Sequence, residues 1–336
     1  MGRVFAASPT GGYKLVRPGE RRHQKGICML KRRFLKVKMN LAWLVFFIAA
    51  IFIATSSDLL AKTATVEQGA KSCLWTVTTP SNKIYLLGSL HVLKQDSYPL
   101  AGTIESAYAD SRIIIFETDI AALQDPAMQA RLLELGLYPA DQDLLQHLDG
   151  DTRQLLGKKL DEVGLSLEQF SKFKPWFVAL TLATLELQRL GYNPAYGVDI
   201  YFFNRATTDG KEIDFLEPAD YQINLLGTMA EQDQKNFLSQ TLKDLEVVNE
   251  LAGDLVRAWK NGDADKLHEL LYKSFKDYPE LHERLLIQRN KNWIKKIEGV
   301  MRTDKNVLIV VGAGHLVGPE SVVDLLRKQG YEVNQQ

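Results

Sequence analysis

The same short sequence pattern occurs twice in the chain, at residues 84–91 and at residues 308–315. Each copy has four apolar residues followed by a glycine, with a histidine three positions after that glycine (His91 and His315). An apolar run of this length that stops at glycine is typical of a buried strand leading into a sharp turn. Residues just beyond such strands lie at the carboxyl edge of an open α/β sheet, where ligand sites form. If both strands belong to one sheet, the pattern therefore predicts two imidazoles at one edge.

The remaining strand and helix patterns fit a single domain. Strands are predicted at residues 73–79, 83–90, 112–117, 211–216, 306–311 and 331–333. Helical patterns cover residues 99–110, 125–206, 219–301 and 318–329, with breaks at glycine and proline. Strand–helix–strand order at both ends, with helices between them, predicts an α/β (α+β) domain over residues 70–335. We expect a central mixed sheet with large helical insertions.

The first 61 residues have the features of an export signal. Residues 1–40 hold eleven Lys and Arg and one acid, and fourteen uncharged residues follow at positions 41–54. A basic segment, an apolar stretch and a small-residue exit are typical of a secretory signal, here cleaved after Ala61 or Ala64. A spanning helix needs about 20 apolar residues, so we favour cleavage over a signal anchor formed by residues 41–57. Both alternatives place the domain outside the cytoplasm, in the periplasm or another extracytoplasmic space, with membrane contact only through an uncleaved N-terminal segment. Met1, Met29 and Met39 all remain possible starts.

Charge and cysteine content narrow the class of protein. The chain has no formal net charge, but after residue 40 there are 30 basic and 40 acidic residues. An acidic domain argues against nucleic acid as a partner. Cys73 is the single cysteine after the apolar stretch, so we expect no intrachain disulfide.

Three side chains that follow predicted strands form the strongest candidate site. They are His91, Glu117 and His315. If their strands are parallel neighbours, the three side chains converge at one edge of the sheet. Two imidazoles and a carboxylate suit Zn, Mn, Co or Fe(II), and they leave positions open for water and substrate. The alternative is that both histidines are ordinary turn residues.

Glycines accompany both histidines. Gly88 and Gly312 end the two apolar runs, and Gly314 precedes His315. Glycine lets a backbone approach a bound group closely, so we assign these three to binding of the cofactor.

Two helical clusters add polar candidates. Arg289, next to Asn290, could stabilise an oxyanion or a carboxylate, although the sequence alone favours a surface salt bridge. Asp199 in the first turn of a helix could simply complement the helix dipole.

Together these motifs resemble the TraB/GumN family over residues 70–335, in family order. The matching motifs are the first Gly-x-x-His, residues 116–119 (Phe-Glu-Thr-Asp), residues 197–199 (Gly-Val-Asp), the Arg-Asn pair with Trp293, and residues 312–315 (Gly-Ala-Gly-His). The family is related to the TIKI proteases of animals. The resemblance implies an erythromycin-esterase/ChaN-like fold and, by similarity to TIKI, a divalent-metal-dependent peptidase centred on the two Gly-x-x-His motifs.

The resemblance also implies roles for individual residues. The family's functional residues match His91 and His315 directly and Glu117 fairly directly. Arg289 and Asn290 match residues that support the active site, and Asp199 matches the family motif more loosely.

Our expectation is therefore a metal-dependent hydrolase of the cell envelope that acts on a peptide or protein substrate with Mn, Co or Zn. Glu117 would be a metal ligand or the general base. Two alternatives remain open. One is a haem- or iron-binding envelope protein of the ChaN type, and the other is a non-catalytic interaction module of a polysaccharide or export system.

Overall fold

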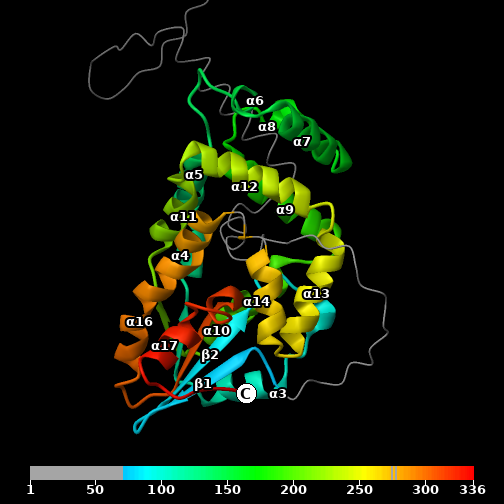
Figure 1. Cartoon of the computed structure of the whole chain (residues 1–336). Helices are drawn as coiled ribbons and strands as arrows, with labels where there is room; N and C mark the ends of the chain where they lie inside the picture. Colours follow the sequence, from blue (N-terminus) through cyan, green and yellow to red (C-terminus); the bar gives the residue numbers. More distant parts are fainter. Residues whose placement is uncertain (1–70, 274, 277) are drawn as a thin grey trace, which may run out of the picture. The chain divides into compact units, whose positions relative to one another are not determined.

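The computed structural model describes residues 71–336, apart from 274 and 277 (Figure 1). The predicted export signal, residues 1–61, lies outside the described residues, so its role stays a prediction. Within the described part of the chain, no helix is both long enough and apolar enough to cross a membrane.

One six-stranded sheet organises the described domain (Figure 1). Its strands in chain order are β1 (Leu74–Thr78), β2 (Lys83–Ser89), β3 (Ile113–Phe116), β4 (Glu212–Phe215), β5 (Val307–Gly312) and β6 (Val333–Gln335). Their order across the sheet is β4-β3-β5-β2-β1-β6. The four strands from β4 to β2 run parallel, whereas β1 pairs antiparallel with both β2 and β6. The predicted mixed sheet is confirmed.

The central strand β5 carries the second of the two Gly-x-x-His patterns and pairs in parallel with β2, which carries the first. Every residue of β5 is buried, as expected for a parallel strand covered on both faces. Ser89 at the end of β2 pairs with Gly312 at the end of β5, and Phe116 at the end of β3 pairs with Val310. The carboxyl ends of β2, β5 and β3 therefore lie side by side, as the sequence predicted for neighbouring parallel strands.

Helices fill the two long segments between strands. Those before β4 are α3 (Gly102–Asp110), α4 (Ile120–Gln124), α5 (Pro126–Leu135), α6 (Leu144–His147), α7 (Gly150–Glu162), α8 (Leu167–Phe170), α9 (Pro175–Arg189) and α10 (Val198–Thr208). Those after β4 are α11 (Ala219–Gly227), α12 (Glu231–Asp244), α13 (Val248–Lys260), α14 (Ala264–Lys273), α15 (Pro279–His282), α16 (Gln288–Val300) and α17 (Val322–Lys328). The apolar helix α9 packs along α12, and Trp176 and Phe177 at its start are fully buried.

The C-terminal elements begin later than the sequence predicts. Helix α17 starts at Val322 rather than near Gly318, because the Ser321 side chain caps it by accepting a hydrogen bond from the Asp324 amide. The last strand begins at Val333, because the chain first turns through Gly330, whose φ of 91° is in the left-handed region.

Candidate functional site

His91 follows β2 and is held by the start of helix α10. The amide of Val198 donates to the carbonyl of Leu90 at 3.0 Å, which brings the helix terminus against the strand end. Nδ1 of His91 lies 3.0 Å from a carboxylate oxygen of Asp199. Both side chains are buried. Asp199 is therefore a partner of His91, and not only a charge that complements the helix dipole.

Gly197 permits this close contact. A Cβ atom at this position would overlap the carbonyl oxygen of His91 and the carboxylate of Asp199. Since the φ of Gly197 is −60°, its backbone conformation is open to any residue. The glycine is needed here for space.

His315 lies in the short 3-10 turn η5 (Ala313–His315) after β5, and its hydrogen bonds fix its tautomer. The Asn290 amide nitrogen donates to the carbonyl of Glu320, so the Asn290 oxygen is the atom that faces His315. That oxygen lies 2.6 Å from Nδ1 of His315. Nδ1 therefore carries the proton, and the lone pair of Nε2 accepts from Arg289 Nη1 at 3.0 Å.

Arg289 connects the histidine to two carboxylates. Its Nη2 lies 2.5 Å from Glu117 and 2.7 Å from Glu217. The Trp293 indole also donates to Glu217, at 2.9 Å. Arg289 is only 1% exposed, so its charge must be balanced inside the protein, and these two carboxylates balance it.

The geometry decides between the alternatives for Arg289 that the sequence left open. Arg289 lies shortly after a π-helical segment (Glu283–Ile287). Its Nη1 donates a hydrogen bond to the carbonyl of Leu285, one turn earlier in the chain. It is a buried cation at the sheet edge, and not part of a surface salt bridge.

Glu117 lies between the ends of three strands. One of its carboxylate oxygens accepts from the amide of Gly312 at the end of β5, and the same oxygen is 3.7 Å from Nε2 of His315. The other oxygen accepts from Gln222 as well as from Arg289. Burial works to raise the pKa of Glu117, but the guanidinium of Arg289 holds it well below its usual range. Glu117 is therefore ionised at neutral pH.

The two histidines have opposite pKa shifts. Burial and the nearby Arg289 cation hold the pKa of His315 well below its usual value, so this imidazole is neutral. Burial also acts to lower the pKa of His91, but the Asp199 carboxylate more than reverses this and raises it. Of the two histidines of the site, His91 is therefore the one that is protonated more readily.

The three glycines predicted to bind a cofactor have distinct positions. A Cβ atom at Gly88 would overlap the buried thiol of Cys73, so the packing of β1 against β2 explains this glycine. Gly312 offers its amide to Glu117. Gly314 borders a pocket next to His91.

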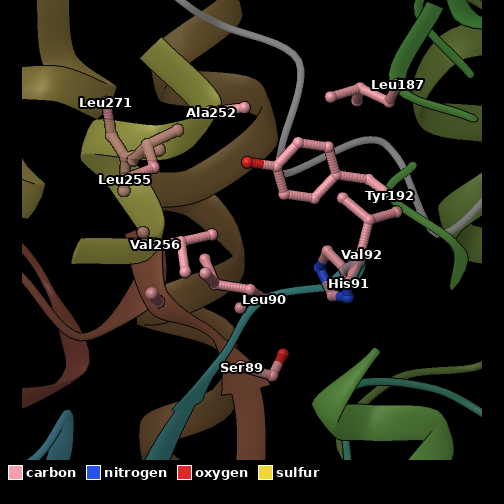
Figure 2. A pocket seen from close by; sticks show the side chains of 13 residues that line it. Ser89, Leu90, His91, Val92, Leu187, Tyr192, Ala252, Leu255, Val256 and Leu271 are labelled. Atoms are coloured by element: carbon pink, nitrogen blue, oxygen red, sulfur yellow. The ribbon is translucent and has the colours of Figure 1, made fainter. Parts of the chain in front are cut away.

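That pocket opens directly beside the strand ends (Figure 2). The space is about 530 Å³, part of it open to solvent. Its residues are Ser89, Leu90, His91, Val92, Leu187, Tyr192, Ala252, Leu255, Val256, Leu271, Gly312, Ala313 and Gly314. Figure 2 shows His91 and Tyr192 on one side, with the aliphatic side chains of α13 and α14 on the other. A molecule that enters the pocket would contact His91.

The imidazole and carboxylate groups of this site are ligands that suit a divalent ion, but their arrangement in the structure does not form a metal centre. Each histidine has its Nδ1 held by an oxygen acceptor, the pattern typical of metal-binding histidines. However, Arg289 lies against both Nε2 of His315 and the Glu117 carboxylate. Among residues 71–273, 275, 276 and 278–336, no three His, Cys, Asp or Glu side chains are grouped so that they could hold an ion. The predicted set of His91, Glu117 and His315 could bind a metal only if the guanidinium moved away from Nε2.

Sequence reasoning missed Glu217 and Gln222. Glu117 directly follows β3, and Glu217 lies two residues after the end of β4, where its amide donates to the Glu117 carbonyl at 2.9 Å. This repeated placement of an acid after a strand could have identified Glu217. Nothing in the pattern of α11 marked Gln222, because polar residues occur throughout that helix.

Comparisons with known proteins place these features in a family. The model of the TraB/PrgY/gumN family matches residues 73–335, almost the whole described domain. YbaP of Escherichia coli K12, an uncharacterised protein, is 25% identical over 252 residues, which cover 75% of this chain and 90% of YbaP. No solved structure matches the chain.

Two zebrafish (Danio rerio) proteins that are named as metalloproteases are also similar to the chain. Metalloprotease TIKI2 is 23% identical over 352 residues, covering 88% of this chain and 67% of TIKI2. Metalloprotease TIKI1 is 23% identical over 327 residues, covering 81% of this chain and 64% of TIKI1. The chain thus spans about two thirds of the length of these relatives.

Proposed function

The chain belongs to the TraB/PrgY/gumN family, and from that premise we propose that it is a metal-dependent hydrolase of the cell envelope that cleaves peptide bonds. One observation carries the proposal. The carboxyl edge of the sheet holds two buried, hydrogen-bonded histidines and an ionised carboxylate, and an apolar pocket opens next to them. The similarity to proteins named metalloproteases supports the same chemistry. The envelope location rests on the predicted export signal.

The metal would be held by His91, Glu117 and His315. When bound, a divalent ion lowers the pKa of a coordinated water and polarises the scissile carbonyl. His315 is suited to this role because it is neutral and its proton is on Nδ1, which leaves the Nε2 lone pair toward the site. Asn290 fixes that orientation from the far side of the ring.

Asp199 supports His91 as a metal ligand. The carboxylate of Asp199 fixes the His91 ring through Nδ1 and stabilises its protonated form. The same hydrogen bond strengthens the ring as a donor to the metal.

Arg289 supplies a fixed positive charge. Its Nη2 donates to Glu217, which the Trp293 indole holds in place, and this support would keep the guanidinium at the ends of the strands if it moved away from His315. A guanidinium in this place stabilises an oxyanion or a substrate carboxylate in a site with little water.

The proposal is tested with metal-free full-length protein and a library of short peptides. Mn²⁺, Co²⁺ or Zn²⁺ is added separately, and cleavage is followed by mass spectrometry. We expect cleavage with at least one of the ions, none without metal, and loss of cleavage in His315→Ala. Metal-independent cleavage, or cleavage that His315→Ala does not change, would contradict the proposal. A haem-binding protein would instead show a Soret band when haem is added, with no cleavage.

A further inference from the structure

The pocket beside His91 is built from segments far apart in the chain. Its walls come from α9, α13 and α14, and its floor comes from the end of β2 and residues 312–314 (Figure 2). Helix α13 is fixed over the strand end because the Trp259 indole donates to the carbonyl of Gly88 at 2.6 Å.

The lining of the pocket selects against charge. The described residues that form it include no Lys, Arg, Asp or Glu. Leu255, Leu271 and Val92 supply apolar surface, so a charged group that entered would lose much of its hydration, and the imidazole of the lining, His91, is already paired with Asp199. An aliphatic or aromatic side chain would gain free energy from the same transfer.

A buried hydroxyl at the floor points to a polar group on the same ligand. Ser89 is 1% exposed, and its Oγ has no hydrogen-bond partner among the described residues. Such an atom is costly to bury unless something binds it. Figure 2 shows the Ser89 oxygen directed from the end of β2 into the pocket, on the side where His91 lies. Ser89 is paired with Gly312, where the absence of a side chain lets another backbone approach.

We propose that the pocket binds the apolar side chain of a substrate residue next to the scissile bond, and that the Ser89 hydroxyl forms a hydrogen bond with the backbone of that residue. This inference rests on the proposed peptidase function, because it takes the ligand to be a peptide. It adds the side-chain preference: aliphatic or aromatic residues are accepted and charged residues are rejected. The Ser89 hydroxyl can donate a hydrogen bond to a peptide C=O or accept one from a peptide N–H, so it suits either group of a substrate backbone.

Two variants and a matched control test the proposal. Val256→Phe fills the pocket from α13, where Val256 is only half-buried and a larger side chain is tolerated. Val163→Phe makes the same change at a half-buried valine after α7 that does not line the pocket. Ser89→Ala removes the hydroxyl without changing the apolar lining. Thermal melting shows that each protein is folded.

The measurement is photo-crosslinking of short synthetic peptides to the full chain, so it does not depend on cleavage. The peptides carry a diazirine analogue of leucine, and mass spectrometry locates the attachment site. We expect attachment to α13 or α14 in the wild type and in Val163→Phe, and roughly tenfold less in Val256→Phe. Ser89→Ala should reduce it about five- to tenfold. Unlabelled peptides with leucine at the central position should compete, and those with aspartate should not.

The outcomes separate this inference from the proposed function. Attachment outside the pocket, unchanged attachment in Val256→Phe, or equal competition by aspartate would overturn the pocket assignment, even if peptides are cleaved. Unchanged attachment in Ser89→Ala would overturn the role of the hydroxyl. Specific attachment in the pocket without any cleavage would support the pocket assignment and count against the peptidase function alone.

Discussion

The Asn290 side-chain oxygen lies 2.6 Å from Nδ1 of His315 and thereby determines which nitrogen of the buried imidazole faces the strand ends. The orientation of the amide is set in turn by its hydrogen bond to the Glu320 carbonyl. This two-step support makes His315 a neutral acceptor at Nε2. If this is its role, removing the amide should affect metal binding more than the fold.

Asn290→Ala should therefore weaken metal binding at least about tenfold, as is usual when a hydrogen-bond partner of a ligand is removed. The buried Nδ1 proton would be left unpaired, so the free energy of unfolding should also fall by about 1–3 kcal/mol. Calorimetric metal titration and urea unfolding measure the two effects. Asn292→Ala, an exposed change on the same helix, is the control and should alter neither quantity. Equal effects in both variants would show that Asn290 does not act through His315.

The pairing of His91 with Asp199 predicts a shift in the histidine pKa. In Asp199→Asn the charge that raises the pKa of His91 is gone while burial remains, so this pKa should fall below that of the wild type. NMR titration of the metal-free protein reports it. Because the folded pKa is raised, the pair stabilises the wild type most below the unfolded pKa of about 6.5. The stability difference between the two proteins should therefore shrink as the pH rises through the folded pKa. An unchanged His91 pKa would contradict the assignment.

Glu117→Gln tests the buried carboxylate. Arg289 keeps Glu217, so we expect a loss of about 1–3 kcal/mol in the free energy of unfolding at pH 7 rather than complete unfolding. The pKa of Glu117 is depressed in the folded state, so its contribution is present above the unfolded pKa of about 4.3 and is lost at lower pH. The difference between the wild type and Glu117→Gln should thus narrow below about pH 4. Urea unfolding across this range measures it, and a difference that is constant with pH would show that Glu117 is not ionised in the fold.

Gly197→Ala tests whether space at the start of α10 positions Asp199. The added methyl group overlaps the His91 carbonyl, so we expect a loss of about 1–3 kcal/mol in stability and a lower His91 pKa. Gly102→Ala is the matched control, because a Cβ atom there has no neighbour within 4 Å. That change should be neutral or slightly stabilising. If Gly197→Ala behaved like the control, the close contact between α10 and β2 would not matter.

The sequence predicted the sheet edge better than the contents of the site. Runs such as residues 308–311 have one physical explanation, a buried strand, and the glycines after them mark the turns. The burial of Arg289 could not be predicted in this way, because an amphipathic helix does not reveal which polar residue faces inward. Its position against Glu117 and His315 depends on tertiary contacts, one of them between residues that are 172 positions apart in the sequence. The apolar pocket was missed for the same reason, since α13 and β2 meet only in the fold.

The most direct test of the account is a titration of metal-free full-length protein with Co²⁺, followed by calorimetry and by the visible absorption of the bound ion. We predict one ion per chain, with binding weakened at least about tenfold in His91→Ala and in His315→Ala. His147→Ala removes a histidine that pairs with Glu231 on the surface, and it should leave the affinity unchanged. The absence of binding, or binding that neither His91→Ala nor His315→Ala weakens, would contradict the claim that the repeated Gly-x-x-His segments form a metal site.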